Sequence, residues 1–120
     1  MAKPGEKGFK RIISAARYSL QGIKACWKRE AAFRQEAIAC IFLLPVALLL
    51  GQTGLERAVM VAVCLVVLIV EVLNSGLEAV VDRIGNEHHD LSGIAKDLGS
   101  AAVFLSLVLL VVVWGLILLD

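Results

Sequence analysis

A stripe of five polar residues inside an apolar stretch offers the clearest chemistry in this chain. Glu71, Asn74, Ser75, Glu78 and Asp82 follow one another at steps of three, one, three and four residues. Because a helix turns by about 100° per residue, these side chains share one narrow helix face. A lower carboxylate on that face can hold Mg²⁺ together with phosphate oxygens, and a higher, desolvated one suits a general base. The spacing therefore predicts a site that joins a water-soluble phosphate donor to an acceptor dissolved in lipid.

Carboxylates inside a bilayer are costly, so this stripe needs partners. A charged carboxylate at the centre of a membrane helix costs at least about 2.5–3.5 kcal/mol on insertion scales. Two such acids on one helix require a metal ion, a basic side chain or a substrate. Two other interpretations stay open at this point. One is a small proton-coupled transporter with Glu71 as the proton carrier, and the other is a non-catalytic subunit whose protonated acids bind neighbouring helices.

The elements that must position the stripe are apolar segments of membrane-spanning length. The chain of 120 residues is 59% hydrophobic and only 19% charged, which excludes both an ordinary soluble domain and a disordered chain. The segments 36–55, 58–81 and 98–119 are each near the roughly 20 residues that cross a bilayer as a helix. We therefore expect an all-α membrane protein with a single domain, 1–120, three transmembrane helices and no nucleic-acid partner.

The segment 1–35 predicts a helix that lies on the membrane surface. Residues 1–36 hold nine of the twelve Lys and Arg residues. Their apolar side chains recur at helical steps of three and four, which gives one apolar face for the headgroup region. With the N-terminus and the loop 82–97 placed in the cytoplasm, eleven basic residues lie inside and one outside. The charge pattern thus predicts a multi-pass protein with a cytoplasmic N-terminus.

The loop 82–97 brings polar and basic groups to the cytoplasmic end of the stripe. Lys96 could neutralise phosphate oxygens, or it could extend to the lipid headgroups. Asp90 or Ser92 is expected to cap the third transmembrane helix. The two adjacent histidines of this loop make a poor metal pair, because neighbouring helical residues do not converge.

The three cysteines predict neither a disulfide framework nor a zinc site. Cys26, Cys40 and Cys64 lie far apart and form no CxxC pair. We expect them to be buried thiols that act as small apolar side chains.

Three stretches of the chain resemble a known family, the small integral-membrane prokaryotic diacylglycerol kinases. They are Glu30–Glu36 (EAAFRQE), Glu71–Gly85 (EVLNSGLEAVVDRIG) and Asp90–Ala102 (DLSGIAKDLGSAA), and the similarity covers essentially the whole chain. The resemblance implies transfer of the γ-phosphate of ATP to diacylglycerol, giving phosphatidate, with Mg²⁺ as cofactor. It also implies a bacterial inner-membrane location and a homotrimer whose active sites are shared between subunits.

The resemblance further implies roles for individual residues. Glu71 is the implied general base on the lipid hydroxyl, Asn74 helps to position the catalytic site, and Glu30 and Glu78 hold the metal ions that bridge the ATP phosphates. The implied nucleotide contacts, besides the two metal ligands, are Arg11, Tyr18, Glu87, His88, His89, Lys96 and Asp97. The implied lipid-substrate contacts, besides Glu71, are Arg11, Ala32, Phe33, Arg34, Gln35, Glu36 and Ser100.

The family that this chain resembles has two branches, which differ in the acceptor lipid. A sister branch of the family phosphorylates undecaprenol. The run Phe33–Glu36 looks more like the diacylglycerol branch. Diacylglycerol is therefore the expected acceptor, with undecaprenol as the alternative.

Overall fold

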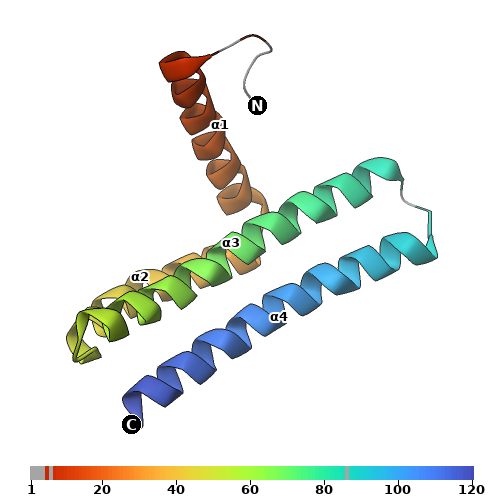
Figure 1. Cartoon of the computed structure of the whole chain (residues 1–120). Helices are drawn as coiled ribbons and strands as arrows, with labels where there is room; N and C mark the ends of the chain where they lie inside the picture. Colours follow the sequence, from red (N-terminus) through yellow and green to blue (C-terminus); the bar gives the residue numbers. More distant parts are fainter. Residues whose placement is uncertain (1–4, 6, 86) are drawn as a thin grey trace.

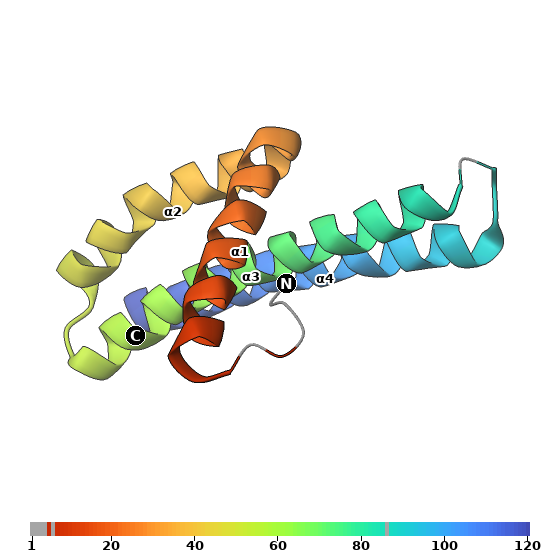
Figure 2. The same ribbon diagram turned by 90° about the horizontal axis from the view of Figure 1, so that it is seen from above.

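The computed structural model describes residues 5, 7–85 and 87–120, and this part of the chain forms four helices. They are α1 (Gly8–Arg29), α2 (Ala31–Leu50), α3 (Gly54–Ile84) and α4 (Asp90–Leu118). Helices α2, α3 and α4 run roughly along one direction, while α1 projects from them at a steep angle (Figure 1 and Figure 2). The predicted all-helical architecture is confirmed, because α2, α3 and α4 are each long and apolar enough to cross a membrane.

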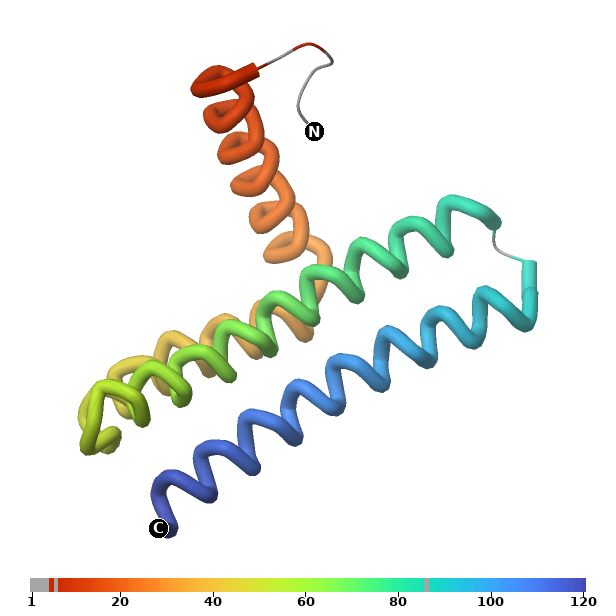
Figure 3. The backbone as a smooth tube through the Cα atoms, viewed as in Figure 1, coloured from red at the N-terminus to blue at the C-terminus, as the bar shows by residue number. Residues whose placement is uncertain are grey.

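A single extended residue separates α1 from α2. Glu30 has φ −112° and ψ 107°, outside the helical region. Its N–H still donates to the Cys26 carbonyl at 2.9 Å, and its own carbonyl accepts from the Arg34 N–H at 3.2 Å. The chain therefore turns sharply at one residue without losing the hydrogen bonds on either side. The corner lies partway along α3, as the tube in Figure 3 shows.

The opposite end of α2 joins α3 through a tight three-residue turn, 51–53. The Thr53 hydroxyl accepts from the Glu56 N–H at 3.1 Å and so caps the start of α3. Gly51 is required here, since a Cβ would overlap both the Arg57 side chain and the Ala47 carbonyl. Arg57 in turn donates to the Gly51 carbonyl at 3.0 Å.

Helix α3 is the central element, packed against α2 on one side and α4 on another. The buried core lies at its N-terminal half and consists of Cys40, Ala47, Met60, Val63, Cys64 and Trp114. The Trp114 indole N–H donates to the Met60 carbonyl at 3.2 Å, which satisfies the ring's polar group inside the core. The expectation for the cysteines is confirmed, because all three are free and buried. The second half of α3 remains available for the polar stripe.

The helix ends differ in places from the expected segments. Helix α2 begins at Ala31 rather than at residue 36, and α3 continues to Ile84, so that it includes the whole polar stripe. The prediction that Asp90 or Ser92 caps the last helix is wrong. His89 is the extended residue before α4, and its ring Nδ1 accepts from the Leu91 N–H at 3.1 Å. Asp90 instead lies in the first turn of α4.

Candidate functional site

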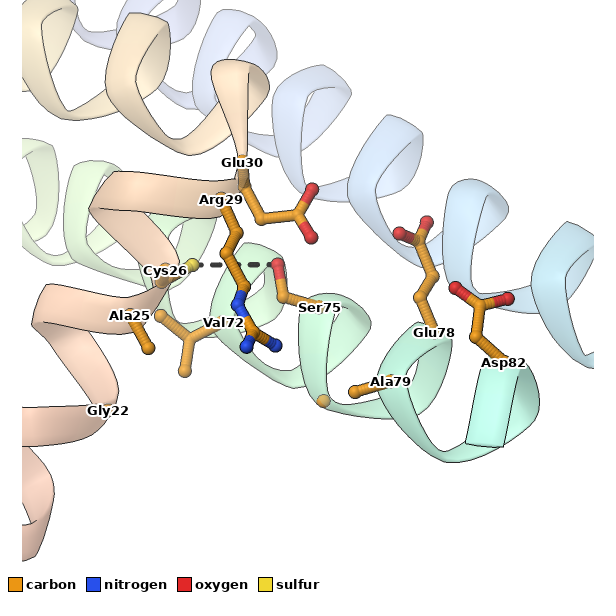
Figure 4. Close-up of a pocket in the computed structure, with 11 residues that line it drawn as sticks. Gly22, Ala25, Cys26, Arg29, Glu30, Val72, Ser75, Glu78, Ala79 and Asp82 are labelled. Atoms are coloured by element: carbon orange, nitrogen blue, oxygen red, sulfur yellow. Dashed lines mark hydrogen bonds between the residues drawn. The ribbon is translucent and has the colours of Figure 1, made fainter. Parts of the chain in front are cut away.

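A cavity of about 400 Å³ lies where the end of α1 meets the second half of α3 (Figure 4). One wall comes from the last two turns of α1 and from the corner residue Glu30, and the other comes from α3. The lining residues are Gly22, Ala25, Cys26, Arg29, Glu30, Val72, Ser75, Gly76, Glu78, Ala79 and Asp82. The cavity therefore joins the corner to three of the five residues of the predicted stripe.

Two predicted metal ligands, Glu30 and Glu78, are brought to this cavity from different elements. Glu30 reaches it because the chain turns there, and Glu78 because it lies on the stripe face of α3. Figure 4 shows the Glu30 carboxylate at the corner and the Glu78 and Asp82 carboxylates on α3. The Asn74 amide donates to Glu78 Oε1 at 3.3 Å and orients that carboxylate. The predicted role of Asn74 in positioning the site therefore has a hydrogen bond to support it.

The donor set of the cavity fits Mg²⁺ in chemical type. Carboxylate oxygens are the protein ligands that Mg²⁺ prefers, and it usually keeps waters and phosphate oxygens as its other ligands. Within residues 5, 7–85 and 87–120, no three His, Cys, Asp or Glu side chains converge into a closed metal cage. A Mg²⁺ held by Glu30 and Glu78 would thus complete its coordination with phosphate and water.

Glu71 lies deeper in the protein than the other acids of the stripe. Only 3% of its surface is exposed, and it does not line the cavity. The carboxyl of Glu36, on α2, lies near the Glu71 carboxyl, and its Oε2 atom is buried. The Ser75 hydroxyl donates to the Glu71 carbonyl at 3.0 Å and accepts from the Cys26 thiol at 3.5 Å. Glu71 is therefore enclosed between α2 and α3, and its side chain does not lie on the surface of the subunit.

A second hollow, of about 220 Å³, lies at the connection between α3 and α4. It brings together four of the predicted nucleotide contacts, namely Glu87, His88, His89 and Lys96. Asp82 lines both this hollow and the cavity beside Glu78. Its Oδ1 also accepts from Lys96 Nζ at 2.8 Å. Asp82 consequently links the predicted metal ligands to the predicted phosphate-binding lysine.

Other predicted contacts lie away from both hollows. Arg11 is exposed and Tyr18 half-buried on α1, while Asp97 and Ser100 are exposed on α4. In the run from Ala32 to Glu36, only the phenyl ring of Phe33 is buried. Neither hollow includes any of these residues.

Arg34 makes contacts that differ from the implied lipid contact. Its Nη1 donates to the Trp27 carbonyl at 2.7 Å and to the Lys28 carbonyl at 3.1 Å. Both acceptors lie in the last turn of α1, where helix carbonyls lack partners within the helix. Arg34 therefore ties the end of α1 to the start of α2 and stabilises the corner at Glu30.

Sequence reasoning missed two features of this site. Arg29 lines the main cavity, yet in the sequence it counts only as one of many basic residues near the N-terminus. Its position directly before Glu30 was the available signal. The ion pair between Asp82 and Lys96 was also missed, although both residues flank the same short loop.

Comparison with known proteins agrees with the residues and the fold. The family model described as Prokaryotic diacylglycerol kinase matches residues 17–118. A diacylglycerol kinase of Pseudomonas aeruginosa is 53% identical over 116 residues, which cover 97% of this chain and 94% of the relative. Diacylglycerol kinases of Escherichia coli K12 and Haemophilus influenzae are 49% and 48% identical, over 92% and 90% of this chain and 91% and 92% of the relatives. We conclude that this chain is a membrane enzyme that belongs to the prokaryotic diacylglycerol kinase family.

Proposed function

We propose that this protein transfers the γ-phosphate of ATP to diacylglycerol at the cytoplasmic face of a bacterial inner membrane, giving phosphatidate. The observation that supports this most directly is the arrangement of acids along α3. Glu71 is enclosed within the protein, whereas Glu78 lines an open cavity about two turns further along the same helix. An enclosed acid suits a reaction with a lipid hydroxyl, and an acid beside an open cavity suits the binding of a nucleotide phosphate.

In the proposed reaction, Glu71 is the general base. Its carboxylate accepts the proton of the lipid hydroxyl while the hydroxyl oxygen forms a bond to the γ-phosphorus. The bond from that phosphorus to the bridging oxygen breaks on the opposite side, and ADP leaves. Glu71 is buried, so bulk water is kept away from the carboxylate that accepts this proton.

Glu30 and Glu78 are the proposed ligands of Mg²⁺, with Asn74 orienting Glu78. When bound there, Mg²⁺ neutralises charge on the ATP phosphates. Lys96 adds a positive charge at the neighbouring hollow and stabilises the leaving phosphates. The remaining nucleotide contacts in this proposal are Arg11, Tyr18, Glu87, His88, His89 and Asp97.

The lipid is proposed to bind along the start of α2, at residues 32–36, with further contacts from Arg11 and Ser100. In this proposal α1 lies on the membrane surface beside the lipid. This position suits α1 because its large apolar side chains Phe9, Ile12, Leu20 and Ile23 are exposed. An apolar face of this kind beside a basic one suits a helix in the headgroup region. In this arrangement the N-terminus is cytoplasmic, and α1 holds the cavity at the membrane surface.

A homotrimer with shared active sites is also part of the proposal. Both hollows are open at the surface of the single subunit, so a neighbouring subunit could complete them. Residues such as Arg11 and Asp97, which lie outside the hollows of their own chain, could contribute to the site of a neighbouring subunit. Association would also bury polar groups of α3 that a single three-helix subunit leaves near lipid.

The decisive test is a lipid-acceptor assay on the purified protein in vesicles. The protein is incubated with Mg²⁺ and γ-labelled ATP, in parallel with diacylglycerol, with undecaprenol and without added acceptor. We expect labelled phosphatidate in the first sample only. Labelled undecaprenyl phosphate would redirect the proposal to the sister branch. Substrate flux across the vesicle membrane without ATP would instead support the transporter alternative.

A further inference from the structure

We propose that Arg29 is a nucleotide-binding residue whose guanidinium contacts a phosphate of the nucleotide held in the cavity between α1 and α3. This inference deepens the proposed kinase function and rests on it. It assigns a role to a residue outside the three stretches that indicate the family.

The position of Arg29 follows from the corner at Glu30. Arg29 is the last residue of α1, directly before the extended residue. Its side chain lines the cavity together with Glu30 and with Val72 of α3. Figure 4 shows this side chain extending from the end of α1 toward α3. The backbone turn that brings Glu30 to the cavity thus also brings the exposed Arg29 side chain there.

The charge of the cavity makes Arg29 distinctive. The other charged residues that line it, Glu30, Glu78 and Asp82, are all acidic. The ion pairs found among the described residues are His88 with Asp90 and Lys96 with Asp82, so neither engages Arg29. Within the same part of the chain, the guanidinium also donates no hydrogen bond to a protein acceptor. Its donors therefore remain available for a ligand.

The neighbouring basic residues do not offer the same group. Arg34 already donates to two carbonyls at the end of α1. Lys28 shares the last turn of α1 with Arg29 but does not line the cavity. Among the described residues, Arg29 is consequently the basic one that lines the same cavity as Glu30 and Glu78.

A phosphate is the ligand that this combination fits best. Guanidinium presents a planar set of donors that matches two phosphate oxygens at once. The phosphate could belong to a nucleotide or to an anionic lipid headgroup, and the chemistry of the contact is the same. The acids in the cavity favour the nucleotide, because they repel a bare lipid phosphate but accept phosphates that arrive with Mg²⁺. The guanidinium would then balance the negative charge of the phosphates that Mg²⁺ leaves uncompensated.

The test compares Arg29→Gln with the matched control Lys28→Gln. Each removes one positive charge from the last turn of α1, and each changes the helix end and the surface charge equally. We expect Arg29→Gln to raise the KM for MgATP and the Kd for MgADP by about tenfold, with kcat changed by about twofold at most. Lys28→Gln should leave all three within about twofold of the wild type, and Arg29→Lys should recover part of the lost affinity. Gel filtration and helical circular dichroism establish that each variant is folded.

Two arms of the experiment separate nucleotide from lipid phosphate. All measurements are made in phosphatidylcholine vesicles and again in vesicles that contain phosphatidylglycerol. The proposal requires the loss of affinity for MgADP in both. A loss confined to the anionic vesicles would overturn it in favour of a lipid headgroup, and unchanged KM and Kd in both would overturn it outright.

Failure of this inference can be distinguished from failure of the kinase proposal. MgADP binding is measured without turnover, so it reports on nucleotide affinity independently of lipid phosphorylation. An active wild type whose Arg29→Gln variant binds MgADP normally would remove only the role of Arg29. A wild type that binds MgADP but phosphorylates no lipid would remove the proposed function and leave the binding result standing.

Discussion

Lys96 and Asp82 form an ion pair, with Nζ 2.8 Å from Oδ1, across the connection between α3 and α4. Asp82 ends the polar stripe of α3, and Lys96 lies in the second turn of α4. The pair therefore joins the acidic cavity to the neighbouring hollow. It also brings the positive charge of Lys96 to a residue that lines the same cavity as Glu78.

We expect Lys96→Met to change activity far more than stability. The two side chains are 47% and 63% exposed, and exposed ion pairs contribute only about 0–1 kcal/mol to stability. The thermal unfolding midpoint should therefore change little, while kcat/KM for MgATP should fall by about tenfold or more. Asp82→Asn is the control, because it breaks the same pair but keeps the lysine. Equal losses in the two variants would show that the lysine acts through Asp82 and not on phosphate.

Glu71→Gln should abolish turnover while nucleotide binding survives. The amide keeps the size of the buried side chain but cannot accept the hydroxyl proton, and removal of a general base costs about 10²–10⁴-fold. Glu71 does not line the cavity, so MgADP affinity should stay within about twofold of the wild type. Steady-state assays and binding of a fluorescent ADP analogue measure the two quantities. Retained turnover in the purified variant would remove the base assignment.

Glu78→Gln should weaken nucleotide binding in a way that depends on Mg²⁺. The amide loses the charge that a divalent cation prefers, so a Mg²⁺ titration of activity should shift to at least about tenfold higher concentration. Asn74→Ala leaves the carboxylate in place but removes its 3.3 Å hydrogen bond, and its shift should be smaller. An unchanged Mg²⁺ titration for Glu78→Gln would contradict the metal role.

Gly99→Ala should destabilise the contact between α3 and α4. A Cβ at this position would overlap the Asn74 amide oxygen and press on the Leu77 side chain. Overpacking of this kind costs about 1–3 kcal/mol, and displacement of Asn74 should also lower activity. Gly115→Ala is a matched control on the same helix, because its Cβ would meet open space and it lines neither hollow. Thermal unfolding in detergent and the kinase assay report both effects, and identical behaviour of the two variants would refute this packing argument.

The thiol of Cys26 should react slowly with maleimide in the folded protein. Burial raises the pKa of the Cys26 thiol, and the nearby acids add to that rise, while the Ser75 hydrogen bond opposes it. A raised pKa leaves less thiolate at a given pH, so alkylation should stay slow from pH 7 to pH 8 and accelerate once the protein is unfolded in SDS. Mass spectrometry of the labelled peptide measures this rate. Rapid labelling of Cys26 in the folded protein at pH 7 would contradict the burial seen here.

Much of the fold could be predicted because it depends on local pattern. Long apolar runs give the three helices of membrane-spanning length, and the polar stripe falls on one face because helical periodicity alone decides it. The burial of the three cysteines followed from their polarity and the absence of paired spacing. These features need no knowledge of how the helices pack together.

The missed features depend on tertiary contacts that no local pattern reveals. Glu30 breaks the helix without a glycine or a proline, and the Arg34 contacts that support this corner come from the following helix. His89 caps α4 because the helical backbone begins at Asp90, which makes His89 the last extended residue before the helix. The proximity of Glu36 to Glu71 requires the register of α2 against α3. The sequence places each group on an element, but the packing decides which groups meet.

Glu30 is both the single extended residue that connects α1 to α2 and part of the wall of the cavity. Because α1 is attached to the rest of the protein through this residue, a tilt of α1 would turn about a residue that borders the cavity. In the proposed placement of α1 in the headgroup layer, the width of the cavity would depend on the angle of this helix. The thickness and curvature of the surrounding bilayer would then act on the proposed nucleotide site.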